Sequence, residues 1–596
     1  MSVVNAPQIE GDPISGGLFN GNFLANRYTL EPGGNLIQIV EYLGLTGLRY
    51  PGGSLTEKLF DIGDPDSPVV YDDDGKAQDF VPLSDFLAYA TANDLTATIV
   101  LPTRDNLSVR MDGNGDRFPS FDETELRVFV RDVATGEYGD TDIVAFEIGN
   151  EYWGSGEMNA VEYGRLSSRM AEVIDDELTL VATETGTSPG IDVIVQSGTN
   201  SGSSNLSANY AGQSAVDILA DLNATYGTDF GSEVVFPNGG MNWRAINDEL
   251  IIKQFDEDEA LAVDGVVTHL YSREAVQPGQ RDFGLNQIEK SWEAAFEGID
   301  IHVTEWNQSA SDPRFDRETD YGLKQAQEVL NIFETMVESG VDQAHIWPLI
   351  QNTRNALSPD SADGGVTPSG ALFAMMSEGL PGKQMLDFAV DDDSVTEFQG
   401  KTADLHGFYG DGELVFYVAS TSDTIETVTF DLDMMVEGGG TPTARTIGVE
   451  DATRPGASDA RATVETLAED DFYDDGQIVA TLAPGEIMEV RLVDFIPTDE
   501  FEQTMIAIDG SEPEAGPFAP DASGALSGGT DDVLNFPDDG YHSAPSAIAE
   551  PSQDDDAPGN EPVAADEAAD AGSGPLDGMG WLLALLPFLG MAGLVG

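Results

Sequence analysis

Residues 146–154 have the sequence FEIGNEYWG and close an apolar stretch that begins at Ile143. An apolar run of this length is typical of a buried strand. The strand would end on Asn150 and Glu151, which are followed by two aromatic residues. A strand that ends on an amide and a carboxylate indicates a functional site if the chain has a second carboxylate in an equivalent place.

Short apolar runs alternate with amphipathic stretches over residues 17–380, which is the pattern of repeated strand–helix units. Eight such units over about 360 residues predict a (β/α)8 barrel, in which chemistry lies at the C-terminal ends of the strands. The expected strands are 17–23, 47–50, 96–101, 143–148, 193–196, 263–271, 299–305 and 343–349. The expected helices are 36–43, 83–93, 123–133, 160–174, 215–226, 286–297 and 323–338.

The pattern changes after Gly379, where alternating segments such as 414–420, 427–434 and 477–495 are separated by Gly and Asp turns. These segments predict an antiparallel β-sandwich. The next residues are rich in Asp, Pro, Ala, Gly and Ser, a composition that does not form a core. We therefore expect a catalytic barrel at 1–380, a β-sandwich at 381–495, a disordered acidic linker at 496–573 and a hydrophobic segment at 574–596.

The chain has 108 acidic and 26 basic residues, a net charge of −82. Such a surface repels nucleic acid and anionic membranes, which excludes both as partners. The charge fits a halophilic protein that stays soluble in salt, although an acidic cytoplasmic proteome has a similar composition. The absence of cysteine excludes disulfides and thiolate catalysis.

The N-terminus has no basic region followed by an apolar one, so no signal peptide is expected. The C-terminus, GMGWLLALLPFLGMAGLVG at 578–596, is the candidate for membrane contact. It has three interpretations: a tail anchor, a C-terminal export signal like those of type I secretion substrates, or a simple interfacial end. The first two predict a secreted or cell-surface protein.

The second carboxylate is Glu305, at the end of the seventh expected strand in the segment IHVTEWN. Two carboxylates that face each other across a pocket allow one to protonate a leaving oxygen while the other attacks an acetal carbon. We expect Arg49, at the end of the second strand, to keep Glu305 ionised. Burial against Tyr152 and Trp153 should raise the pKa of Glu151.

Other residues at the strand ends are candidates for substrate binding. Asn150 is placed to donate a hydrogen bond to a sugar hydroxyl, and tryptophans suit the apolar faces of sugar rings. Together with Arg49, the expected substrate-binding residues are Asn150, Trp153, His269, Tyr271, Trp306 and Trp347.

The motifs RYPGG at 49–53, GNE at 149–151 and EWN at 305–307 resemble those of the clan A glycoside hydrolases, most closely the α-L-arabinofuranosidases. The resemblance covers about 17–495 and implies a (β/α)8 barrel with a C-terminal β-sandwich. It implies that Glu151 is the acid/base and Glu305 the nucleophile, with Arg49 and Tyr271 beside the nucleophile and Trp347 as the strand-eight tryptophan. Ser54 follows RYPGG where arabinofuranosidases usually have Asn, so xylosidase-like and glucuronidase- or heparanase-like branches are alternatives.

Each candidate also has a purely structural interpretation. Asn150 and Glu151 are residue types that cap helices. Glu305 pairs readily with Arg49 in a structural ion pair, and His269, Tyr271 and Trp347 suit the barrel core.

Two further patterns are weaker. Residues 112–123 place Asp112, Asn114, Asp116 and Glu123 at positions 1, 3, 5 and 12 of a calcium loop, but position 6 is Arg117 instead of glycine. If the substrate is anionic, the expected basic groups are Arg104, Arg110 and Arg273, which also suit surface ion pairs.

The sequence thus predicts a retaining glycoside hydrolase that acts on an oligo- or polysaccharide without a cofactor or a catalytic metal. One alternative is a non-catalytic carbohydrate-binding protein on the same barrel. Another is a calcium-dependent adhesive or secretion role carried by the acidic tail.

Overall fold

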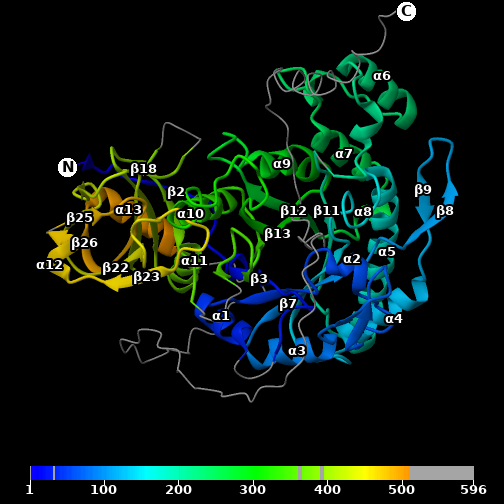
Figure 1. The fold of residues 1–596 in the computed structure, drawn as a ribbon, viewed down its shortest axis with the longest axis horizontal. Helices are drawn as coiled ribbons and strands as arrows, with labels where there is room; N and C mark the ends of the chain where they lie inside the picture. Colours follow the sequence, from blue (N-terminus) through cyan, green and yellow to red (C-terminus); the bar gives the residue numbers. More distant parts are fainter. Residues whose placement is uncertain are drawn as a thin grey trace, which may run out of the picture.

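The computed structural model describes residues 2–30, 34–200, 202–359, 365–389, 395–474 and 476–510 (Figure 1). Its main feature is a closed parallel barrel of eight strands, as predicted. In barrel order these are β3 (Asn20–Asn22), β4 (Gly47–Tyr50), β7 (Thr96–Leu101), β10 (Ile143–Ile148), β11 (Asp192–Gln196), β12 (Gly265–Ser272), β13 (Asp300–Gln308) and β14 (Gln343–Ile346), which pairs with β3. Most strands are buried along their whole length, so they have apolar runs instead of alternating residues.

Helices lie outside the barrel and connect its strands. The longest, α5 (Ala160–Thr185), begins at a capping box formed by Asn159 and Glu162 and ends where Gly186 takes a left-handed conformation. The others are α1 (Asn35–Leu43), α3 (Leu83–Ala92), α4 (Glu123–Ala134), α6 (Ala215–Tyr226), α7 (Trp243–Ile252), α9 (Phe283–Ala295), α10 (Leu323–Glu338) and α11 (Pro368–Gly379).

Helix α7 was not predicted. Its buried residues include Arg244, Asn247 and Asp248, and the Asp248 carboxylate accepts hydrogen bonds from Gly198 N and Trp292 Nε1. Because half of its buried residues are polar, the apolar period that reveals an amphipathic helix is interrupted in α7.

Short elements decorate the barrel. They are helices α2 (Leu55–Leu59) and α8 (Glu257–Ala260), and the strand pairs β5 (Val69–Tyr71) with β6 (Ala77–Asp79), β8 (Leu107–Met111) with β9 (Arg117–Pro119), and β15 (Ile350–Gln351) with β16 (Ser358–Pro359). In Figure 1 the β8–β9 hairpin and α6 project from the molecule at the end away from the second domain.

The predicted β-sandwich is present. One sheet contains β17 (Gln384–Asp387), β18 (Phe398–Gln399), β19 (Ala403–Gly410), β20 (Glu413–Ser420), β26 (Ile487–Pro497), β22 (Val436–Val449) and β23 (Ala462–Thr466). The other contains β21 (Glu426–Asp431), β25 (Gln477–Leu482) and β24 (Tyr473–Asp474), which follows the short helix α12 (Glu469–Phe472). Phe416, Phe430 and Ile478 share the core between the two sheets.

The larger sheet is also buried against the barrel domain. Along β20, Phe416 and Val418 belong to the sandwich core, whereas Val415 and Tyr417 belong to the core shared with the barrel. Because successive side chains point to opposite faces of a strand, this two-sided burial explains the unbroken apolar run of 414–419.

The N-terminal residues pair with the second domain, although the sequence analysis grouped them with the barrel. Strand β1 (Ser2–Val3) pairs with β21, and β2 (Gln8–Glu10) pairs with β17. These strands supply edges to both sheets, a long-range pairing that a sequence pattern does not reveal.

The acidic linker was expected to begin at residue 496, but the chain stays ordered to residue 510. Strand β26 continues to Pro497, and helix α13 (Asp499–Gly510) follows it. Phe501 is 1% exposed and its ring lies 5.7 Å from that of Tyr409. Phe501 and Ile508 belong to the sandwich core and anchor the helix, although the composition of this segment predicted disorder.

The rest of the expected linker and the hydrophobic segment 574–596 lie outside the described residues. Within the ranges given above, no helix is long and apolar enough to cross a membrane.

We predict that a protein ending at Thr498 is less stable than one ending at Gly510, because it lacks the Phe501 anchor. Phe501→Ala should lower the free energy of unfolding by about 3–5 kcal/mol, as for other buried Phe→Ala changes. Ile506→Ala is the matched control, since Ile506 lies on the same helix and is 58% exposed. Thermal unfolding followed by circular dichroism checks this, and equal stability of the two variants would contradict it.

Candidate active site

The guanidinium of Arg49, from β4, occupies the centre of the barrel mouth and is fully buried. It forms a bidentate pair with Glu147 of β10, with Nε–Oε2 and Nη2–Oε1 distances of 2.7 and 2.9 Å. Its remaining donors reach Glu305 Oε1 at 3.1 Å, Asn22 Oδ1 at 3.0 Å and Asn150 Oδ1 at 2.9 Å. One arginine therefore ties β3, β4, β10 and β13 together with all five of its N–H directions engaged.

Glu305 lies in the C-terminal half of β13, where a register irregularity falls between Val303 and Trp306. Its Oε2 accepts a hydrogen bond of 2.7 Å from Tyr271 Oη, and its Oε1 faces Arg49. Burial raises the pKa of this carboxyl, while Arg49 and Tyr271 act to lower it. The expected contact with Arg49 is thus present, but burial outweighs its effect on the pKa.

Glu151 follows β10 in a left-handed backbone conformation, with φ of 48°. Glutamate adopts this conformation rarely, so the surrounding structure must hold Glu151 in place. Glu151 Oε1 lies 3.1 Å from His269 Nδ1, and the same nitrogen lies 3.7 Å from Glu305 Oε2. Burial and the charge of Glu305 together raise the pKa of Glu151 to about 7, although the hydrogen bond with His269 acts to lower it.

Glu151, His269 and Glu305 each contribute an atom within 4.8 Å of those of the other two. This spacing would also suit a metal ion. However, the oxygens of Glu305 already face Arg49 and Tyr271, and a guanidinium repels a cation.

A residue that the sequence analysis missed fixes the backbone at Glu151. Glu57, on α2, is buried and accepts hydrogen bonds from the backbone N–H groups of Thr103, Arg104 and Asn150, at 2.8, 2.8 and 2.7 Å. It also accepts one from Thr103 Oγ1 at 3.0 Å. A single carboxylate thereby aligns the chain after β7 with the chain after β10. Nothing in the motif LTEKL distinguishes Glu57 from a surface glutamate.

The predicted aromatic residues have different positions. Trp347 lines the pocket, and its ring passes so near Gly53 that a Cβ there would come within 2.9 Å of it. Trp153 instead packs edge-on against Tyr152 and His269, behind Glu151.

Trp306 was expected to contact substrate, but it points out of the barrel. It is fully buried and packs against Phe373 of α11, so it contributes to the core instead of the pocket. Its neighbour Glu305 points inward because adjacent residues of a strand face opposite sides.

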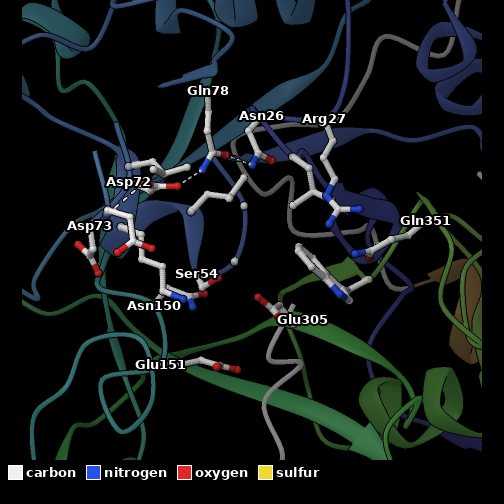
Figure 2. Close-up of a pocket in the computed structure, with 18 residues that line it drawn as sticks. Asn26, Arg27, Ser54, Asp72, Asp73, Gln78, Asn150, Glu151, Glu305 and Gln351 are labelled. Atoms are coloured by element: carbon white, nitrogen blue, oxygen red, sulfur yellow. Dashed lines mark hydrogen bonds between the residues drawn. The ribbon is translucent and has the colours of Figure 1, made fainter. Parts of the chain in front are cut away.

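A pocket of about 320 Å³ opens above the two glutamates. Figure 2 shows Glu151 and Glu305 at its base, with Asn150 and Ser54 beside them. One wall is a hydrogen-bonded row in which Asn26 donates to Gln78 at 3.0 Å and Gln78 donates to Asp72 at 3.1 Å. The opposite wall carries Trp347 and Gln351.

The arginines proposed for an anionic substrate do not line this pocket. Arg104 pairs with Asp73 and Glu157, at 2.9 and 2.8 Å, and Arg273 pairs with Asp312 at 3.2 Å. Arg110 stacks on the ring of Phe118. The basic residues that line the pocket are instead Arg27 and Lys58.

The expected calcium loop forms the turn of the β8–β9 hairpin. Asp112 Oδ1 accepts hydrogen bonds from the backbone of Asn114 and Asp116, and its Oδ2 lies 2.6 Å from Arg165. Glu123 pairs with Arg169 at 2.9 Å on the neighbouring helix. The three carboxylates of the motif do not gather into a cation-binding group among the described residues.

Comparison with solved structures identifies the architecture. The chain is similar to the α-L-arabinofuranosidase of Thermotoga maritima in its arabinose complex, with a TM-score of 0.53, 14% identity and coverage of 83% of this chain and 99% of that one. The thermostable GH51 α-L-arabinofuranosidase of Thermotoga petrophila has a TM-score of 0.53 and 14% identity, with coverage of 82% of this chain and 99% of that one. The GH51 arabinofuranosidase of Xanthomonas axonopodis pv. citri has a TM-score of 0.51 and 13% identity, with coverage of 82% of this chain and 100% of that one.

The chain shares its fold with these arabinofuranosidases. The resemblance predicted from RYPGG, GNE and EWN is therefore confirmed for the barrel and the sandwich. No protein-family model and no curated protein sequence matches the chain. At identities of 13–14% the likeness concerns the fold, and the chemistry has to be argued from the site itself.

The pKa of about 7 for Glu151 gives a direct prediction. As the pH rises from about 6 to 8, the C=O absorbance of protonated carboxyls should fall, and pH-difference infrared spectroscopy should detect this change. Asp192 and Glu338 titrate in the same range, so the contribution of Glu151 is obtained by comparing variants. The change should be smaller in Glu151→Gln than in the wild type and unaltered in Glu157→Gln, which removes an exposed carboxylate from the same loop. An equal change in Glu151→Gln and the wild type would contradict the prediction.

Proposed function

We propose that the protein is a retaining glycoside hydrolase in which Glu151 is the acid/base and Glu305 the nucleophile. One observation carries the proposal: Glu151 follows β10, Glu305 lies in the C-terminal half of β13, and a carboxylate oxygen of one comes within 4.8 Å of a carboxylate oxygen of the other. Retaining glycosidases hold their two carboxyl groups about 5–5.5 Å apart, whereas inverting enzymes need about 6.5–9.5 Å to admit a water molecule.

Electrostatics favour different roles for the two groups. Arg49 and Tyr271 both contact Glu305 and stabilise its ionised form, which is the form that attacks carbon. No arginine or lysine of the described residues contacts Glu151 directly, and its pKa of about 7 keeps much of it protonated near neutrality. A carboxyl with this pKa suits a general acid.

In the first step, a carboxylate oxygen of Glu305 forms a bond to the anomeric carbon of the substrate. The bond from that carbon to the leaving oxygen breaks, and Glu151 transfers its proton to this oxygen. The products are a glycosyl ester on Glu305, an alcohol and the Glu151 carboxylate.

In the second step, Glu151 takes a proton from a water molecule whose oxygen attacks the anomeric carbon. The ester bond breaks, Glu305 leaves as a carboxylate, and the sugar is released with its original configuration. The change of role follows from charge: once Glu305 is an ester, its negative charge no longer raises the pKa of Glu151.

The pocket supports a carbohydrate substrate. Asn150 lies beside both glutamates, where it can donate to a sugar hydroxyl, while Trp347 offers an aromatic face and Asn26, Gln78 and Gln351 offer polar groups. The solved relatives are named arabinofuranosidases, so an arabinofuranoside is the first substrate to test. Xylosides and glucuronides follow, since Ser54 lines the pocket where the arabinofuranosidase motif has Asn.

We predict that Glu305→Ala lowers kcat on aryl glycosides by about 10⁵-fold or more, as expected for loss of a nucleophile. Glu151→Ala should lower kcat by about 10²–10⁴-fold for substrates with poor leaving groups. For dinitrophenyl glycosides, whose leaving group needs no proton, the rate of glycosyl-enzyme formation should fall much less. Sodium azide should restore turnover in both variants with opposite outcomes. The azide product should have retained configuration with Glu151→Ala and inverted configuration with Glu305→Ala.

The measurement is initial-rate kinetics in concentrated salt, with the anomer of each azide assigned by proton NMR. Glu157→Ala is the matched control and should leave kcat unchanged. The same azide anomer from both variants would contradict the assigned roles. Tight binding of oligosaccharides without turnover by the wild-type protein would favour the non-catalytic carbohydrate-binding alternative.

A further inference from the structure

The N-terminal end of the barrel, opposite the pocket, carries a row of carboxylates on adjacent strands. Asp192 begins β11 and Asp300 begins β13, while Asp264 and Asp342 immediately precede β12 and β14. None of the four forms a salt bridge in the part of the chain that the structure describes. Burial raises the pKa of Asp192, and the other three carboxylates raise it further, to about 7, which reflects how closely these charges are gathered.

Two of the four carboxylates have an evident structural role. Asp264 Oδ2 accepts a hydrogen bond from Val193 N at 2.8 Å, and Asp342 Oδ2 accepts one from Ile301 N at 2.8 Å. These bonds complete the strand ladder at the barrel edge. The side chains of Asp192 and Asp300, which alternate with them along the barrel edge, accept no hydrogen bond from any described residue.

A buried histidine faces the same place. His302 lies two residues after Asp300 and therefore on the same face of β13. It is 1% exposed, and both of its ring nitrogens lack a hydrogen-bond partner among the described residues. A ring nitrogen lies within 4.8 Å of carboxylate oxygens of Asp192 and Asp300, which are equally close to each other.

Gly265 makes room for this ring. A Cβ at Gly265 would lie 2.9 Å from His302 Cδ2 and 3.0 Å from Nε2, so any side chain there would displace the imidazole. A buried imidazole without a partner is costly, which makes an unrecorded ligand the simplest account of its position.

We propose that Asp192, Asp300 and His302 bind one divalent transition-metal cation, such as Zn²⁺ or Mn²⁺, at the base of the barrel. Two carboxylate oxygens and one imidazole nitrogen form a donor set that suits these ions, whereas Ca²⁺ and Mg²⁺ prefer oxygen ligands alone. Asp192 and Asp300 are only partly buried, so water can complete the coordination. The ion offsets two of the four negative charges in the row and links β11 to β13 across β12.

Other acidic groups with a histidine do not meet the same criteria. His406 lies near Glu334 and Glu397, but its Nδ1 is 3.0 and 2.9 Å from the two oxygens of Glu334. Burial lowers the pKa of His406, but Glu334 outweighs this and raises it to about 9. That histidine is protonated and already paired, whereas the ring of His302 makes no hydrogen bond to any residue that the structure describes.

The test is equilibrium dialysis of the whole protein at pH 8 in concentrated KCl, after removal of metal with EDTA. Zn²⁺, Mn²⁺, Mg²⁺ and Ca²⁺ are tested separately, and bound metal is measured by mass spectrometry. We expect one Zn²⁺ or Mn²⁺ per chain, little Mg²⁺ or Ca²⁺ at the same concentration, and a higher unfolding temperature of the metal-loaded protein.

The double variant Asp192→Asn/Asp300→Asn should lower the affinity for the metal at least 100-fold and abolish the rise in unfolding temperature. The single variant Asp192→Asn should lower the affinity at least 10-fold. The matched control Asp411→Asn/Asp423→Asn removes two exposed carboxylates from the β-sandwich and should bind metal like the wild type. The proposal fails if the wild type binds no ion at 100 μM. That result would mean that Asp192 and Asp300 share a proton instead of binding a metal. The proposal also fails if both double variants bind equally. Glycosidase activity is not part of the readout, so the outcome is independent of the proposed function.

Discussion

The five hydrogen bonds of Arg49 are the interaction on which the rest of the site depends. A fully buried guanidinium is stable only when its charge and its donors are matched, and loss of a partner from such a pair costs several kcal/mol. Here the partners come from three other strands and from the loop after β10, so they fix the relative positions of Asn22, Glu147, Asn150 and Glu305. The closed barrel supplies the frame that holds these groups, and Arg49 sets their spacing at its mouth.

The same arginine explains why the two glutamates differ. The barrel mouth contains the carboxyls of Glu147, Glu305 and Glu151 around the one guanidinium of Arg49. This guanidinium contacts Glu147 and Glu305 directly but not Glu151. The third carboxyl is buried without such compensation, so its pKa rises to about 7. Glu57 then holds the backbone before Glu151 through the N–H of Asn150, which keeps the carboxyl of Glu151 close to Glu305. A stable ion pair and a nearby uncompensated carboxyl are thus two consequences of one arrangement.

Much of this was predictable from the sequence, because buried parallel strands give apolar runs and barrel chemistry lies where these runs end. That logic located Arg49, Asn150, Glu151, His269, Tyr271, Glu305 and Trp347. It failed at Trp306, where the motif EWN does not show which side chain points inward. Glu147 was overlooked although a charged residue within an apolar strand is itself a signal of a buried ion pair. Glu57, the polar face of α7 and the N-terminal strands of the sandwich depend on contacts between distant segments, which leave no local pattern.

The central claim is that Glu305 forms a covalent bond to the sugar. The most direct measurement is peptide mass spectrometry after incubation with dinitrophenyl 2-deoxy-2-fluoroglycosides of arabinofuranose, xylose and glucuronic acid, which form the glycosyl-enzyme but hydrolyse slowly. The account predicts one sugar per chain, attached to the peptide that contains Glu305, and no label in Glu305→Gln. Label on Glu151, or turnover of the corresponding aryl glycoside without any labelled peptide, would contradict it.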